Sequence, residues 1–273
     1  MNFKFFFPTF RTRYRFVRTR LRKLSKEQPF ERGLNLGTGE GDYDRMIAGF
    51  CQELIGCDVN EPDLEHARAL NKGVMNLRYE LNNALELTYP DNHFDLVVSS
   101  EVIEHVGQPE KMVQEIYRVL RPGGYAVITF PSQEFPITYD PVNRIWQLFS
   151  GDGQREYAIS QGAYAFGHEY LIPGEPFKRW AENAGFEIVE FKGLSRHLTG
   201  LAEMYWTGIA QSIFKKNAGN LTEESKGALK VRPASTKESS LVTLTDAWID
   251  IDEAIFSWSN RSVGKGVVLR KQG

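Results

Sequence analysis

The sequence contains few cysteines and no long apolar run. Its 273 residues include only Cys51 and Cys57, with no Cys-x-x-Cys pair and no Cys/His cluster. This excludes a disulfide scaffold and a zinc finger, and it favours a reduced, cytoplasmic setting. No stretch of about 18 apolar residues is present, which excludes a transmembrane helix. The composition, 41% hydrophobic, 12% aromatic and 25% charged, is typical of a globular protein built as one enlarged domain with insertions.

Acidic residues are missing from residues 1–26, which carry nine Lys or Arg side chains. The rest of the chain holds 24 basic and 35 acidic residues, so the net charge of −2 conceals two oppositely charged parts. Tyr14, Val17, Leu21 and Leu24 recur at helical spacing and form one apolar stripe. We therefore expect a basic amphipathic helix within residues 1–28.

Short apolar runs alternate with helical patterns from about residue 33 to 131, which predicts βαβ units and a parallel sheet. The expected strands are 34–36, 53–59, 77–81, 94–99, 125–130, 186–191 and 267–269, and the expected helices are 43–50, 62–70, 110–120 and 176–184. The 94–99 run is apolar almost throughout, as in a strand buried on both faces. The predicted core therefore covers residues 29–196 and receives its last strand from residues 263–273.

Two stretches interrupt this pattern. Residues 132–170 are rich in aromatic side chains, and residues 197–262 form an expected helical insertion. Within the insertion we predict a helix at 201–214, a polar, mobile linker at about 216–240 and a helix at 241–258. The last helix carries Leu241, Leu244, Trp248, Ile251, Ile255 and Trp258 at heptad-like spacing. We expect these helices to belong to the core or to a lid, whose aromatic side chains line an acceptor pocket.

A glycine-rich turn, Gly37-x-Gly39-x-Gly41, follows the first expected strand and precedes a helix. Such a turn lets the backbone approach a ligand closely. The dinucleotide pattern G-x-G-x-x-G is broken because position 42 is Asp. Asp58 lies 21 residues after Gly37, at the end of the second strand, where a carboxylate accepts hydrogen bonds from ribose hydroxyls. Together these features predict a nucleoside-bearing cofactor across the strand ends.

Several segments occur in the motif order of one family: LNLGTGEGDYDRMI, IGCDVN, LNNALELTYPDNHFDLVVSSEVIEHV and EIYRVLRPGGYAVITFP. The chain resembles the class I S-adenosylmethionine-dependent methyltransferases, most closely the small-molecule and quinone-biosynthesis type. The resemblance covers about 33–131, with a weaker match at 166–191. It implies an α/β fold: a Rossmann-like, mostly parallel seven-stranded sheet with an antiparallel last strand, helices on both faces and an inserted helical lid.

The resemblance also implies a cofactor site. Leu36, Gly37, Thr38, Gly39 and Gly41 would surround the methionine part of S-adenosylmethionine. Asp58 would bind the ribose, Val59 would pack on the adenine, and Asn83 would accept from the adenine amino group. Ser99 and Glu101 would lie beside the methionine part and the reacting methyl. Asn35 and Asn83 depart from the family, which often has Asp at both positions, and an Asn oxygen can still accept a hydrogen bond.

Transfer of the sulfonium methyl requires an aligned nucleophile, and an oxygen nucleophile also requires a base. The candidate catalytic residues are His105, His168 and Glu101. Glu101, Glu104 and His105 would share one face of a helical turn, and with His168 they could hold a divalent metal. We do not favour that metal, because the Glu-His-Val turn is frequent in this fold without one.

The basic N-terminal helix has three interpretations. The first is a cap over the cofactor site, since the family often carries a helix there. The second is peripheral contact with an anionic membrane surface on its inner, cytoplasmic face. Nucleic acid is disfavoured as a partner, because the body of the protein is acidic and no RNA-binding module accompanies the charge.

The sequence therefore predicts methyl transfer to a small or lipid-like acceptor, on oxygen because His105 and His168 offer bases. Two alternatives remain. One is a catalytically silent partner subunit with a methyltransferase fold, which the departures at Asn35 and Asn83 allow. The other is an NAD(P)-dependent oxidoreductase, which Asp42 disfavours.

Overall fold

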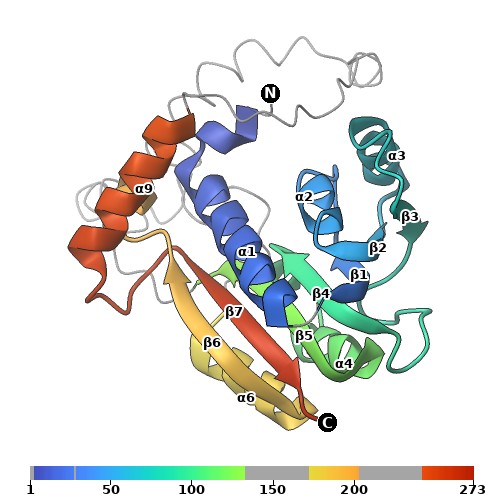
Figure 1. Cartoon of the computed structure of the whole chain (residues 1–273). Helices are drawn as coiled ribbons and strands as arrows, with labels where there is room; N and C mark the ends of the chain where they lie inside the picture. The colour runs from blue at the N-terminus through green and yellow to red at the C-terminus, as the bar shows by residue number, and fades with distance from the viewer. Residues whose placement is uncertain (1–2, 28, 133–171, 203–241) are drawn as a thin grey trace, which may run out of the picture.

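A seven-stranded sheet in the order β3-β2-β1-β4-β5-β7-β6 organises the chain (Figure 1). The computed structural model describes residues 3–27, 29–132, 172–202 and 242–273. The strands are β1 (Phe30–Leu36), β2 (Cys51–Asp58), β3 (Leu77–Leu81), β4 (Phe94–Ser100), β5 (Leu120–Pro131), β6 (Phe186–Leu194) and β7 (Gly264–Lys271). Strand β7 runs antiparallel to both β5 and β6, and the pairs among β1 to β5 are parallel. The predicted mostly parallel α/β fold is confirmed.

Helices cover both faces of this sheet. They are α1 (Pro8–Glu27), α2 (Asp44–Ala48), α3 (Glu61–Leu70), α4 (Pro109–Val119), α6 (Gly174–Ala184) and α9 (Val242–Phe256), with short 3-10 turns η1 (Phe3–Phe6) and η2 (Ile103–His105). One buried cluster joins α4 and α6 to the sheet through Met112, Ile116 and Phe177. A second joins α1 and α2 to the opposite face through Leu21 and Ile47. Strand β4 is buried along nearly its whole length because both clusters press on it.

One strand is longer than predicted. Strand β5 begins at Leu120, directly after α4 ends at Val119, and not at residue 125, so Pro122-Gly123-Gly124 lies inside it. The register between β4 and β5 shifts there, and Gly123 adopts a positive φ of 79° that accommodates the irregularity. The predicted helix 201–214, the aromatic segment 132–170, His168 and the linker 216–240 lie wholly or largely outside the described residues. Among the described helices, none has the length and hydropathy needed to cross a bilayer.

Candidate functional site

The sheet reverses its strand order between β1 and β4. Strand β1 pairs with β2 on one side and with β4 on the other, and all three run parallel. The carboxyl ends of such strands at a point of reversal form the usual ligand site of an open α/β sheet. The loops that meet there begin at Gly37 after β1, at Val59 after β2 and at Glu101 after β4.

Three glycine residues allow the loop after β1 to lie close to its neighbours. Gly37, Gly39 and Gly41 have φ values of 72°, 51° and 83°, a region that side chains rarely adopt. A Cβ atom on Gly37 would come within 2.3 Å of Val102 Cγ2, so the loop after β4 touches the glycine turn directly. The three glycines carry no Cβ, so the backbone of the turn can approach a ligand at close range.

A buried polar network lies beneath the glycine turn. Asp44 is fully buried and accepts hydrogen bonds from Asn35 Nδ2 at 2.6 Å, Thr38 Oγ1 at 2.7 Å and the Tyr79 hydroxyl at 2.8 Å. Burial raises the pKa of Asp44. The network explains the departure at position 35, because Asn35 donates to a carboxylate that comes from the next helix.

Asn71 extends the same network to the backbone of the turn. Its Nδ2 donates to the Tyr79 hydroxyl at 2.9 Å and to the Gly41 carbonyl at 2.8 Å. Our sequence reasoning missed Asp44, Asn71 and Tyr79. The only available signal was an acidic residue in the first turn of the helix after the glycines, and this did not reveal its inward orientation.

Asp58 lies at the end of β2, as predicted. Its Oδ2 accepts from the Gly39 amide at 2.9 Å, and its Oδ1 accepts from the Asn60 amide at 3.1 Å. A carboxylate has roughly four acceptor positions, so two remain for a ligand. Val59, the next residue, exposes 66% of its surface, an unusual cost for an aliphatic side chain beside a buried strand.

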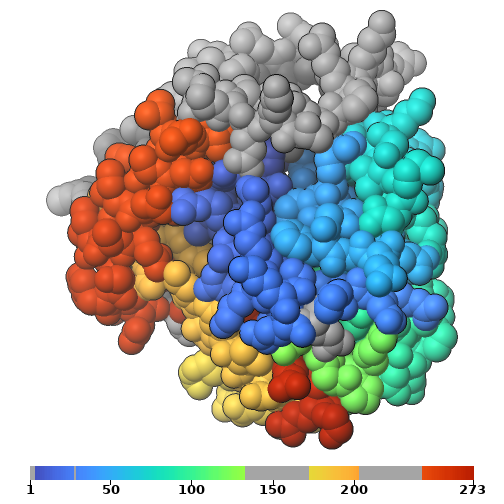
Figure 2. Space-filling view, viewed as in Figure 1, coloured from blue at the N-terminus to red at the C-terminus, as the bar shows by residue number. Residues whose placement is uncertain are grey.

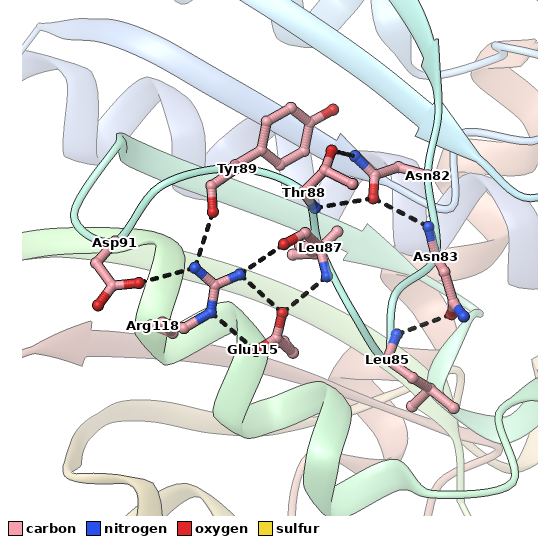
Figure 3. Close-up of polar contacts among 9 residues, drawn as sticks. All are labelled: Asn82, Asn83, Leu85, Leu87, Thr88, Tyr89, Asp91, Glu115 and Arg118. Atoms are coloured by element: carbon pink, nitrogen blue, oxygen red, sulfur yellow. Dashed lines mark hydrogen bonds and ion pairs between the residues drawn. The ribbon is translucent and has the colours of Figure 1, made fainter.

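The loop after β3 is rigidly held, and Asn83 is on it (Figure 3). Asn83 Oδ1 accepts from the Leu85 amide at 3.0 Å. Asn82 Oδ1 accepts from the amides of Asn83 at 3.0 Å and Thr88 at 3.2 Å. The Asn83 oxygen therefore keeps one lone pair for another donor.

Arg118 of α4 fastens the far part of this loop (Figure 3). Its guanidinium donates to the carbonyls of Leu87 at 2.7 Å and Tyr89 at 2.8 Å. It also donates to Glu115 at 2.8 Å, and Glu115 accepts from the Leu87 amide. The side chain of one helix thus determines the position of the loop that carries Asn83.

The end of β4 carries Ser99 and Glu101. Ser99 is buried, and its hydroxyl makes no hydrogen bond within the part of the chain that the structure describes. Glu101 has a positive φ of 58°. Its carboxylate accepts from Arg13 Nη1 at 2.7 Å and from Thr129 Oγ1 at 3.1 Å. A strained, hydrogen-bonded carboxylate at a strand end is a feature of functional sites.

Glu101, Glu104 and His105 do not share the predicted helical turn, although His105 Nε2 lies 3.9 Å from Glu104 Oε1. The 3-10 turn covers only Ile103–His105, and Glu101 precedes it in a left-handed conformation. The Glu104 side chain is fully buried, whereas His105 exposes 42% of its own. Burial and the nearby charge of Glu101 raise the pKa of Glu104 well above its usual range. Among the described residues no group of three His, Cys, Asp or Glu side chains could hold a metal.

The N-terminal segment crosses the site (Figures 1 and 2). Lys4 Nζ contacts Glu40 Oε2 at 2.7 Å and Asp42 Oδ2 at 2.6 Å, both in the glycine turn. Arg13 of α1 contacts Glu101 after β4. The segment therefore bridges the two loops between which a ligand would lie.

Aromatic contacts reinforce this position. The rings of Phe10 and Tyr14 meet Tyr43 edge to face at centroid distances of 5.5 and 5.4 Å. Tyr43 begins α2 directly after the glycine turn. Burial raises its pKa to about 12, so its hydroxyl stays protonated at neutral pH. These contacts support the interpretation of the N-terminal helix as a cap.

Comparison with known proteins agrees with this geometry. Residues 34–128 match a family model described as a methyltransferase domain. A ubiquinone/menaquinone biosynthesis C-methyltransferase from Haemophilus ducreyi is 30% identical over 185 residues, which cover 63% of this chain and 70% of that protein. The corresponding enzyme from Hydrogenovibrio crunogenus is 29% identical over 192 residues, 66% of this chain and 74% of that protein.

Solved structures share the fold at lower identity. Phosphoethanolamine N-methyltransferase 2 from Haemonchus contortus, in complex with S-adenosyl-L-methionine, has a TM-score of 0.56 at 19% identity and covers 93% of this chain and 52% of that one. The [4+2]-cyclase SpnF also has a TM-score of 0.56 at 19% identity, with coverages of 93% and 81%.

Fold, site and relatives together define a class. The chain belongs to the class I S-adenosylmethionine-dependent methyltransferases. It is a methyl-transferring enzyme whose cofactor is S-adenosylmethionine. The alternative interpretation, an NAD(P)-dependent oxidoreductase, is therefore wrong.

Proposed function

We propose that the enzyme methylates a hydroxyl-bearing, small or lipid-like acceptor, and that Glu101 receives the acceptor hydroxyl. The observation that carries this proposal is the Glu101 carboxylate, fixed by Arg13 and Thr129 at the end of β4. Oxygen is the proposed receiving atom. A ring carbon beside the hydroxyl is the second candidate, because the relatives from Haemophilus ducreyi and Hydrogenovibrio crunogenus are named C-methyltransferases.

The residues at the strand ends suit S-adenosylmethionine. The positive φ angles of the glycine turn leave its backbone accessible, as a methionine moiety requires. Asp58 retains acceptor positions for ribose hydroxyls, and exposed Val59 offers an apolar surface for adenine. We propose that Leu36, Thr38, Asn83 and Ser99 complete this site.

The cofactor supplies an electrophilic methyl group, so the protein must align the acceptor and accept its proton. Two acceptor positions of the Glu101 carboxylate are used by Arg13 and Thr129, and the others can receive an acceptor hydroxyl. His105 is the alternative base, since its ring is accessible to a ligand. Glu104 is not suited to this role, because its side chain is fully buried.

Ion pairing of the N-terminal segment supports a cap over the site more than contact with an anionic membrane. At least five of its nine basic side chains pair with carboxylates elsewhere in the described part of the chain: Lys4, Arg11, Arg13, Arg15 and Arg20. A lipid-like acceptor would then enter beside this cap. Co-sedimentation with anionic liposomes, comparing the full chain with residues 27–273, separates the two interpretations. Equal pelleting of both would exclude membrane contact through this segment.

The proposal is tested with labelled S-adenosylmethionine and a panel of phenolic and quinol acceptors. Mass spectrometry and NMR of the product distinguish an O-methyl from a C-methyl group. Glu101→Gln should lower kcat by about 10² or more, because a positioned base contributes about that factor. Binding of S-adenosylhomocysteine should change little in this variant.

Glu65→Gln is the matched control, because Glu65 is an exposed residue of α3 away from the site. Unchanged kcat in Glu101→Gln would contradict the role of Glu101. Tight binding of S-adenosylhomocysteine without turnover of any acceptor would instead favour the silent partner subunit.

A further inference from the structure

Helix α9 attaches to the protein through its charged face. Asp246 accepts two hydrogen bonds of 2.8 Å from Arg11 of α1, and Asp250 pairs with Arg15 at 2.7 Å. The other two acids are also engaged: Asp252 accepts from the amides of Arg196 and Leu198, and Glu253 pairs with Lys192 at 2.8 Å. All four carboxylates of α9 are therefore satisfied by the body of the protein.

The opposite face of α9 is apolar and exposed. Its large side chains are between 40% and 76% exposed, and we call this row the α9 seam: Leu244, Trp248, Ile251, Ile255 and Trp258. We predicted that this helix belongs to the core or to a lid. A core position for the stripe is wrong, because the buried side chains are Val242, Thr245, Ile249 and Asp252. In Figures 1 and 2 the helix forms one edge of the molecule.

The seam spacing is that of a helix-to-helix contact. Successive members are separated by four, three, four and three residues, which is the alternation of core positions in a coiled coil. Within α9 the seam runs from Leu244 to Ile255, about 17 Å at 1.5 Å per residue, and Trp258 follows just after the helix ends at Phe256. An apolar row of this length on an otherwise charged helix indicates an interaction surface.

We propose that the α9 seam pairs with the α9 seam of a second copy of this chain, antiparallel about a two-fold axis at Ile251. A two-fold contact must be self-complementary. Positions equally distant from Ile251 face each other in this arrangement. Leu244 faces Trp258 at each end, and next to the axis large side chains face small ones. Trp248 lies opposite exposed Ala254, and Ile255 lies opposite exposed Ala247. Such alternation lets facing side chains interdigitate.

The charges of α9 favour this occupant over a lipid surface. Residues 242–258 contain four acids and no Lys or Arg, so an anionic membrane would meet no cation on this helix. Between two copies the same acids cause limited repulsion, because each is paired with a cation or with backbone amides of its own chain, although the Asp250 side chain is 63% exposed. The contact is small, so we expect a micromolar dimer.

Sedimentation velocity of the full chain at about 1 to 200 μM tests the dimer. The wild type should change from the 31.2 kDa monomer to twice that mass as its concentration rises. Ile251→Glu should weaken dimerisation by at least about tenfold, because it buries two carboxylates at the axis. Ser257→Glu, exposed on the same segment but off the seam, should leave it unchanged. Circular dichroism and binding of S-adenosylhomocysteine verify that each variant is folded.

A second measurement tests the orientation. Ile251→Cys should be joined to its counterpart by a short bis-maleimide, whereas Ser257→Cys should not; native Cys51 and Cys57 are buried. A wild type that stays monomeric at the highest concentration would overturn the proposal. So would a dimer that Ile251→Glu does not weaken, or a monomer that pellets with neutral liposomes. A dimer in which Ile251→Cys fails to cross-link would overturn the antiparallel arrangement.

Discussion

The Gly39 amide donates a 2.9 Å hydrogen bond to Asp58 Oδ2. This contact joins the glycine turn after β1 to the end of β2, across the strand ends where the cofactor is proposed to lie. Asp58 therefore has two functions in our interpretation. It fixes the shape of the turn, and it offers its remaining acceptor positions to ribose.

Asp58→Ala should weaken binding of S-adenosylhomocysteine by about 10- to 100-fold, because charge-assisted hydrogen bonds contribute about 1.5 to 3 kcal/mol each. Asp58→Asn should weaken binding of S-adenosylhomocysteine less, since its side-chain oxygen can still accept a hydrogen bond from Gly39 or from a ribose hydroxyl. Isothermal titration calorimetry measures both. An affinity of Asp58→Ala equal to that of the wild type would show that the carboxylate does not bind the cofactor.

Gly37→Ala and Gly39→Ala form a matched pair. Both residues have positive φ, but an added Cβ meets Val102 at 2.3 Å only at Gly37 and meets nothing within 4 Å at Gly39. We expect Gly39→Ala to lower the free energy of unfolding by about 1 to 2 kcal/mol, from backbone strain alone. Gly37→Ala should cost about 2 to 5 kcal/mol, because overpacking is added to the strain. Urea unfolding checks this order, and equal losses would contradict the close contact with Val102.

Asn35→Asp should destabilise the enzyme, although Asp is frequent at this position in the family. The change replaces the amide that donates to Asp44 at 2.6 Å by a second carboxylate. We expect a loss of about 2 kcal/mol or more. Thermal unfolding of the double variant Asn35→Asp/Asp44→Asn is the control, since it restores one donor and one acceptor. A double variant less stable than Asn35→Asp would contradict this pairing.

Glu104→Gln should make stability less dependent on pH. The pKa of Glu104 is raised in the folded state by burial and by Glu101, from an ordinary value of 4.5. The folded protein therefore holds a proton that the unfolded chain has released, and wild-type stability falls as pH rises from 4.5 toward the raised pKa. The glutamine variant lacks this loss, so its Tm advantage should grow as pH rises above 4.5 toward the raised pKa of Glu104.

Glu110→Gln, on the exposed start of α4, is the control variant measured over the same pH range. A Tm difference between Glu104→Gln and the wild type that is constant with pH would mean that Glu104 is ionised in the folded state.

The order of strands and helices was predictable because each element has a simple periodicity. The apolar run of β4 reflects burial between two clusters, and the glycines with Asp58 mark the ends of β1 and β2. The amphipathic pattern of α1 was equally clear. The spacing of residues along the chain predicts these features, and the structure contains them.

Orientation was not predictable from spacing. Glu104 and His105 are neighbours with opposite exposure, since the turn that holds them begins only at Ile103. The apolar stripe of α9 indicated a core or lid position, but the acids of this helix pair with cations or backbone amides of the body and leave the stripe exposed. Asp44 was missed because spacing does not show that its side chain points inward, toward Asn35, Thr38 and the distant Tyr79.

Strand β7 has a consequence for the synthesis of the chain. It lies between β5 and β6 and pairs with both, although it follows them in sequence. During translation β6 therefore has no place in the sheet until residues 264–271 leave the ribosome. Until then β5, which contains Phe130, and β6, which contains Phe191, present open edges. Such edges are sites of aggregation in growing chains. The interval between the synthesis of β6 and β7 is thus the period when a nascent chain most needs a chaperone.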